Sequence, residues 1–277
     1  MTACSLRDLA TCLPQKFFEF ILSILNEPLK YLLKITKDLL TESVNIQVFG
    51  GLWSVIIYII SLFFGIFLII AGFNFIISGY NAAKREKAKS WLANIILMII
   101  FVQASYFIYK VLIDINNNLT KGIFSLINPT FFSLTFNNFG DIGLQLILII
   151  PYLIILVITA LLLGLRYLLV SIGVVLFPIA LFLYFIPPLK DYGKMLLSLL
   201  LIIIFVTFFD VIILLGASIL TNTQSLSNIR IILVISAFLT INLFMLFLII
   251  FSFLKAAFSV MNSDVGKSVT KAVKYIV

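Results

Sequence analysis

The chain has 277 residues, of which 63% are hydrophobic and 11% are charged, and its formal net charge is +8. An ordinary soluble domain is about 45–50% apolar and about 25% charged, so a water-soluble fold could not bury this much apolar surface. Because the sequence contains no histidine, a Ser-His-Asp triad, a histidine-ligated zinc site and a histidine proton relay are excluded. We expect no enzymatic activity, no metal and no cofactor.

The first region, residues 1–52, is mixed in character and is expected to be extracytoplasmic. From Pro14 to Glu42 the pattern predicts an amphipathic helix interrupted at Pro28. One face carries lysines and the other leucines: Lys30, Lys34 and Lys37 against Leu29, Leu32, Leu33 and Leu40. Such a helix lies along a membrane surface, packs on a partner or docks on the protein's own bundle, and the sequence leaves these alternatives open. Cys4 and Cys12 could pair if this segment faces an oxidising exterior.

Six apolar stretches follow, and a transmembrane helix needs about 20 apolar residues. They are residues 53–79, 91–109, 142–165, 167–186, 195–220 and 231–254, and the longest loop expected between them is 110–141. Residues 53–254 are therefore expected to form a transmembrane domain, and residues 255–277 a basic cytoplasmic tail. The predicted fold is an all-α polytopic transmembrane bundle that begins with an amphipathic helix.

A dense basic cluster between the first two stretches sets the expected orientation. It consists of Lys84, Arg85, Lys87 and Lys89, and it either marks the topology alone or also docks on acidic lipid or a cytoplasmic partner. Cytoplasmic loops of membrane proteins collect lysine and arginine, so this loop is expected in the cytoplasm and the N-terminus outside. An odd number of crossings also places Lys190, Lys194 and the basic tail inside. We therefore predict five crossings of the cell (inner) membrane, with the C-terminus in the cytoplasm.

The segment 142–186 determines the number of crossings. We expect a span at 142–165 and a re-entrant hairpin at 167–186, with helix breaks at Gly173, Pro178, Pro187 and Pro188. Backbone groups freed at that depth must be buried in protein or line a wet cavity, so the hairpin would be a candidate pore or interface element. The alternative is six ordinary spans with a tight turn at Arg166.

Polar side chains inside these stretches are the candidate functional residues. Asp210 lies in an expected span, where a carboxylate costs several kcal/mol unless it is paired, neutralised or hydrated. Arg166 is its partner by charge, and the pair could join two helices or line a polar path; alternatively Asp210 is protonated and Arg166 extends to the interface. Uncharged polar groups in the spans are expected to form interhelical hydrogen bonds worth roughly 0.6–2 kcal/mol. They are Asn74, Asn94, Gln103, Gln145 and Asn242.

Two parts of the chain contain motifs that are typical of a known class of membrane protein. In the first, Ala71-Gly72-Phe73 ends a span and Arg85-Glu86-Lys87-Ala88-Lys89-Ser90-Trp91 opens the next. This is similar to the hairpin of type IV secretion membrane subunits and of their two-helix pilins. The second part contains Leu165-Arg166-Tyr167-Leu168, Phe177-Pro178-Ile179 and Ile186-Pro187-Pro188. It is similar to the core of TrbL-type polytopic subunits, a broad group that includes the CedA-like archaeal DNA-import proteins.

The resemblance implies a membrane channel or scaffold component of a type IV secretion or DNA-transfer apparatus. It implies that the chain forms a homo-oligomer and works with an ATPase, a pilin and DNA in transit. Residues 84–91 would form the cytoplasmic tip and residues 166–188 the central helical core. Two rival hypotheses are a small-molecule or ion transporter with its site at Asp210 and Arg166, and a membrane scaffold that passes nothing.

Overall fold

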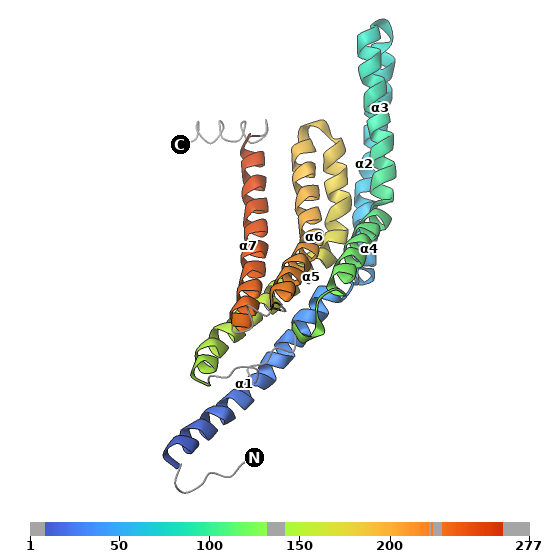
Figure 1. Cartoon of the computed structure of the whole chain (residues 1–277). Coiled ribbons are helices and arrows are strands. Elements are labelled where there is room, and N and C mark those ends of the chain that lie inside the picture. The colour runs from blue at the N-terminus through green and yellow to red at the C-terminus, as the bar shows by residue number, and fades with distance from the viewer. Residues whose placement is uncertain (1–8, 132–141, 222, 224–228, 263–277) are drawn as a thin grey trace, which may run out of the picture. The chain divides into compact units, whose positions relative to one another are not determined.

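The structure, a computed structural model, describes residues 9–131, 142–221, 223 and 229–262, and every regular element in these ranges is helical (Figure 1). The α-helices are α1 (Leu9–Thr41), α2 (Gly50–Ile77), α3 (Ala82–Gln103), α4 (Ser105–Phe124), α5 (Ile142–Phe185), α6 (Lys190–Thr221) and α7 (Arg230–Asn262). Short 3-10 turns lie beside them: η1 (Gln47–Phe49), η2 (Ser78–Tyr80), η3 (Pro129–Phe131) and η5 (Pro187–Leu189). The all-α fold predicted from the sequence is confirmed.

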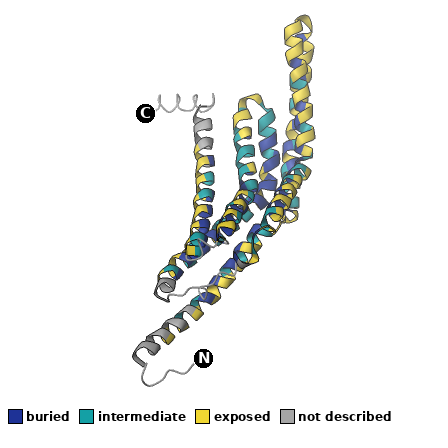
Figure 2. Cartoon of the chain, in the orientation of Figure 1, coloured by how far each residue is buried: buried dark blue, intermediate teal, exposed yellow. Residues whose placement is uncertain are grey.

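Four described stretches are long and apolar enough to cross a membrane. They are Gln47–Tyr80, Ile147–Phe185, Pro187–Thr221 and Arg230–Ser252. The pair α3 and α4 makes a fifth when it is counted as one span bent by 61°. Large apolar side chains such as Ile69 and Phe73 are exposed on these helices, and exposed residues follow α2 and α3 along much of their length (Figure 2). Exposing so much apolar surface is unfavourable in water but not in contact with lipid chains. The chain is therefore a polytopic membrane protein.

Helix α5 corrects the layout expected for residues 142–186. It is one helix of 44 residues and runs through Arg166, Gly173 and Pro178 without a break. The re-entrant hairpin is therefore wrong, and so is a turn at Arg166 between two separate spans, because the helix is continuous through both places. Pro178 deprives one carbonyl of its donor, but the residue is buried, and packing against neighbouring helices makes proline tolerable within a span. The helix ends before Pro187 and Pro188, which lie in η5.

The second expected span, residues 91–109, also differs from the structure. Helix α3 already begins at Ala82 and ends at Gln103, and α4 continues after the 61° bend to Phe124. At the bend, the indole N–H of Trp53 donates a hydrogen bond to Ser105 Oγ over 2.9 Å, which ties the start of α4 to α2. Residues 110–124 were expected to begin a long loop. In the structure they are helical and form the greater part of α4.

The amphipathic pattern of the N-terminal region is present in α1. Leu29, Leu33 and Leu40 are buried and the three lysines of the other face are exposed. The interruption expected at Pro28 is wrong, since α1 is continuous from Leu9 to Thr41. Pro28 has no backbone N–H group, so α1 loses one hydrogen bond there. Burial of Leu29 and Leu33, which follow Pro28 within two turns, stabilises the helix against this loss. Of the open alternatives, docking on the protein's own bundle fits this burial.

The chain divides into two compact units. Unit 1 comprises residues 1–42, 117–166 and 207–246, and unit 2 comprises residues 43–116, 167–206 and 247–277. In unit 1, Phe238 packs against Phe131 and Tyr152, with ring centroids 6.4 and 6.3 Å apart. The possible pairing of Cys4 with Cys12 and residues 263–277 of the basic tail lie outside what the structure describes.

Unit 2 has an apolar core to which α2, α3, α4 and the adjoining parts of α5 and α6 contribute. Its fully buried members are Ala71, Val102, Tyr109, Val170, Val174 and Ile204. Aromatic contacts link the helices around it. The ring centroid of Phe182 in α5 lies 6.0 Å from that of Phe63 and 6.0 Å from that of Phe67, both in α2. This packing positions the α2–α3 hairpin and the α5–α6 hairpin.

Candidate functional site

Unit 1 contains both ionisable side chains that the sequence singled out within its apolar stretches, and both are buried. Asp210 of α6 is 0% exposed and Arg166 of α5 is 4% exposed. The guanidinium of Arg166 lies near enough to act electrostatically on the Asp210 carboxyl group. Arg166 is therefore buried within the protein, and the charge state of Asp210 stays a prediction. Neither carboxylate oxygen of Asp210 has a hydrogen-bond partner among the described residues.

A second polar contact in unit 1 joins α5 to α7. The side-chain amide of Asn242 donates to the carbonyl oxygen of Ile155 over 3.1 Å, and the hydroxyl of Thr159 donates to the same oxygen over 2.8 Å. This is the kind of interhelical hydrogen bond expected for Asn242. The other amides expected to do the same differ, because Asn74, Asn94 and Gln103 are exposed on their helices. The side chain of Gln145 lies outside the described part of the chain.

The charged pair belongs to a larger set of buried polar side chains in unit 1, which we call the polar interior. It contains Asn26, Thr36, Asn117, Thr120, Thr159, Arg166, Thr207, Asp210, Ser218, Thr221 and Asn242. The sequence did not predict the burial of Asn117 and Thr120, because the expected second span ended before them and they were assigned to the loop 110–141. An amphipathic pattern continued past Tyr109 would have found them. Buried polar and ionisable side chains within a membrane domain bind a cation or proton, or hold the helices together.

The basic cluster expected at the cytoplasmic tip lies at the start of α3 in unit 2. Lys84, Arg85, Lys87 and Lys89 are all exposed. Asn81 caps the helix, since its side-chain oxygen accepts hydrogen bonds from the backbone N–H groups of Ala83 and Lys84 over 3.0 and 3.3 Å. The guanidinium of Arg85 lies 5.9 Å from the centre of the Phe75 ring and so packs α3 against α2.

Glycines of unit 2 allow close approaches that the sequence did not reveal. A Cβ atom on Gly173 would lie 2.1 Å from Tyr109 Oη, and that hydroxyl donates to the carbonyl oxygen of Val170 over 2.7 Å. A Cβ atom on Gly193 of α6 would lie 2.2 Å from the backbone nitrogen of Tyr184 in α5. Gly173 was expected to bend α5, whereas in the structure it leaves room for a buried tyrosine from α4.

Comparison with known proteins identifies the family. The family model of the TrbL/VirB6 plasmid conjugal transfer-like proteins matches residues 22–274. The chain belongs to this family. The match contains both charged residues of the polar interior, the basic tip and both close-packed glycines. No curated protein and no solved structure matches the chain significantly.

Membership of the TrbL/VirB6 family makes the chain a multi-pass membrane component of a conjugal transfer system, which works with the other components of that system. The resemblance noted in two parts of the sequence is confirmed over most of its length. Within the described residues, no group of three or more acidic or cysteine side chains is arranged to hold a metal ion. The buried polar residues of unit 1 and the basic cluster and packed glycines of unit 2 thus belong to a membrane component of a conjugal transfer system.

Proposed function

We propose that the chain is a channel or scaffold subunit of a type IV secretion apparatus that transfers DNA or protein and that it has no catalytic activity of its own. The family match over residues 22–274 carries this proposal. The helices are consistent with it, because the described spans are long, apolar and exposed to lipid over much of their surface. An ATPase of the same apparatus would supply the energy.

We infer five crossings of the cell membrane, with the N-terminus outside and the C-terminus in the cytoplasm. The number follows when α5 is one crossing and α3 with α4 is another. The inner side then holds the α3 cluster, Lys190, Lys194 and the basic tail, and the outer side holds Lys110, Lys121 and Arg230. This distribution satisfies the preference of lysine and arginine for cytoplasmic segments.

The exposed amides of α3 support assembly into an oligomer. Asn94 and Gln103 lie on the surface of a helix that would otherwise face lipid. Polar side chains in that position gain stability when they form hydrogen bonds with another transmembrane helix. A second copy of the chain or another transfer subunit would provide that helix, while DNA in transit and a pilin complete the proposed partners.

A second candidate function rests on the polar interior of unit 1. Asp210 and Arg166 are both buried, and the carboxylate oxygens have no hydrogen-bond partner among the described residues. Ionisable residues within a membrane commonly mark the path of an ion or proton. A small-molecule or ion transporter would use this pair as its binding site.

Transfer assays distinguish the two candidate functions. We expect deletion of the gene to abolish DNA transfer between cells and the wild-type gene to restore it. Under the secretion proposal, Asp210→Asn affects transfer only as far as it lowers the amount of folded protein, which a membrane immunoblot measures. If Asp210→Asn leaves transfer intact and abolishes uptake of a solute, the transporter hypothesis is correct instead.

Thiol labelling of single-cysteine variants in a background without Cys4 and Cys12 tests the topology separately. We expect Lys89→Cys, Lys190→Cys and Lys271→Cys to react only after the cytoplasmic side is opened. Lys121→Cys, the matched control, should react in intact cells. Labelling at position 190 in intact cells would overturn the five-crossing layout.

A further inference from the structure

A pocket of about 410 Å³ opens between α2 and α3 at the tip of their hairpin, within unit 2. It is lined by Asn74, Ile77, Ser78, Lys84, Lys87, Ala88 and Trp91. The α3 residues of the lining recur every three or four positions, so they share one face of the helix. That face is turned toward the end of α2 and the turn η2.

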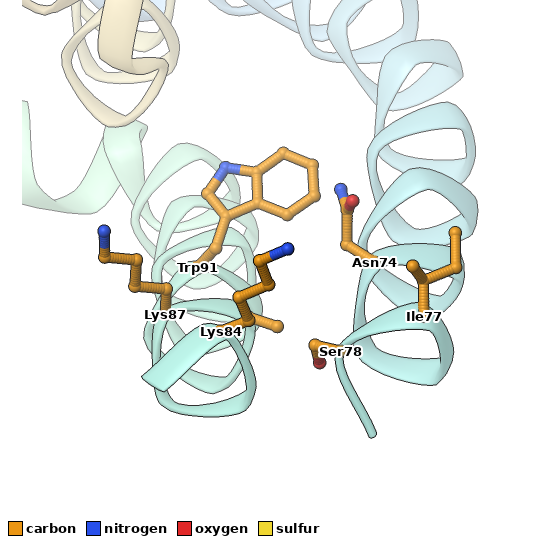
Figure 3. Close-up of a pocket in the computed structure, with 7 residues that line it drawn as sticks. Asn74, Ile77, Ser78, Lys84, Lys87 and Trp91 are labelled. Atoms are coloured by element: carbon orange, nitrogen blue, oxygen red, sulfur yellow. The ribbon is translucent and has the colours of Figure 1, made fainter. Parts of the chain in front are cut away.

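The polar groups of this pocket suit an anion. Its described lining includes Lys84, Lys87 and the Asn74 amide but no carboxylate. Lys84 and Trp91 project from α3 across the gap toward Asn74 of α2, while Lys87 lies on the outer side of Trp91 (Figure 3). The N-terminal end of α3 adds partial positive charge near Lys84, because helix dipoles favour anions there.

The surroundings of the pocket suit an acyl chain. Ile76 and Ile77, in the last turn of α2, are both 73% exposed, and Tyr80 next to them is fully exposed. They lie at the end of the membrane-crossing stretch Gln47–Tyr80. Tryptophan and tyrosine are enriched at this depth, where lipid headgroups meet the hydrocarbon core. The occupant must therefore combine a compact anionic group with an apolar part.

We propose that this pocket binds the phosphate-bearing headgroup of an anionic phospholipid between Lys84 and Asn74, with Lys87 adding positive charge from the far side of Trp91 and the acyl chains along the exposed face of α2 (Figure 3). A cavity of this size lies in the range that admits one small ligand. It favours a single headgroup over a nucleic acid strand, which needs an extended basic groove. The proposal depends only on the chain lying in a membrane and not on its role in transfer.

Lipid binding to the full-length protein in a neutral detergent provides the test. Native mass spectrometry would compare phosphatidylglycerol, phosphatidylcholine and inorganic phosphate as probes. We expect tighter binding of phosphatidylglycerol than of phosphatidylcholine, about a fivefold loss of that affinity for Lys84→Gln and a smaller loss for Lys87→Gln, whose ammonium group lies farther from Asn74 (Figure 3). Asn74→Ala leaves the charge unchanged and should also weaken binding, which a diffuse electrostatic attraction would not predict.

The matched control is Lys190→Gln with Lys194→Gln, which removes two exposed lysines from the other basic connector. This control should bind phosphatidylglycerol as the wild type does. The Lys84→Gln/Lys87→Gln double variant is compared with this control. The proposal would be overturned if the double variant kept its affinity for phosphatidylglycerol, or if the control lost as much affinity. Displacement of phosphatidylglycerol by millimolar inorganic phosphate would assign the pocket to free phosphate instead. Size-exclusion profiles and helical content establish that each variant is folded.

Discussion

In unit 1 the interior includes Arg166, Asp210 and Asn242, whereas the interior of unit 2 is an apolar core in which glycines bring helices together. Inside a membrane the hydrophobic effect contributes little to helix association, because lipid chains are as apolar as leucine side chains. Polar contacts and close packing are the remaining sources of stability. The comparison indicates that unit 1 uses mainly the first source and unit 2 mainly the second, and three sets of substitutions test that difference.

The largest expected effect is in unit 1. Arg166→Leu should lower the free energy of unfolding by about 3–5 kcal/mol, because it leaves the Asp210 carboxyl group buried beside no cation. Arg166→Leu/Asp210→Leu should recover most of this loss, because neither charge then remains. Steric trapping in bicelles would measure both values. If the double variant is as unstable as the sum of the single variants, the two residues are not coupled and unit 1 is not stabilised by this pair.

The next effect is in unit 2. Gly193→Ala should lower the free energy of unfolding by about 1–3 kcal/mol, because its Cβ atom would overlap the backbone of Tyr184. Gly216→Ala is the matched control in the same helix, since nothing lies within 4 Å of a Cβ atom there. Alanine at that position should leave stability unchanged or raise it by up to about 1 kcal/mol. Equal effects of both substitutions on unfolding in detergent would contradict close packing at Gly193.

The smallest effect sharpens the comparison within unit 2. Tyr109→Phe should cost about 1 kcal/mol, because it removes one buried hydrogen bond to Val170. The same variant removes the oxygen that would meet a Cβ atom at position 173. Gly173→Ala should therefore cost less in the Tyr109→Phe protein than in the wild type, which a double-mutant cycle measures. Purely additive losses would show that the hydroxyl does not require glycine at position 173.

Periodicity and charge were sufficient for the features that depend on one helix at a time. The burial of Leu29, Leu33 and Leu40 followed from their spacing, and Asp210 was conspicuous as a charge within an apolar stretch. Features that depend on two helices were not predictable in this way. The contact of Tyr109 with Gly173 joins residues 64 positions apart, and no pattern along one helix encodes it.

Proline was the main source of error in the sequence-based expectations. Pro28 and Pro178 were expected to interrupt helices, and both lie inside continuous ones. Loss of one hydrogen bond is a local cost, and the packing that offsets it comes from other helices. Pro187 and Pro188 do lie between helices. Because neither proline has an N–H group, two carbonyl groups of a continuous helix would lack their donors there. The pocket at Lys84, Lys87 and Trp91 was likewise missed because half of it belongs to α2.

The length of α5 has a consequence for how the chain enters the membrane. Its apolar part, Ile147–Phe185, has 39 residues, and at about 1.5 Å per residue it is about twice as long as the hydrocarbon core is thick. During synthesis the residues before Arg166 already suffice to cross the bilayer, and those after it suffice a second time. The insertion machinery thus meets two complete candidate spans where the finished protein has one helix. By the preference of lysine and arginine for the cytoplasm, Lys190 and Lys194 beyond Pro188 favour the layout with one crossing.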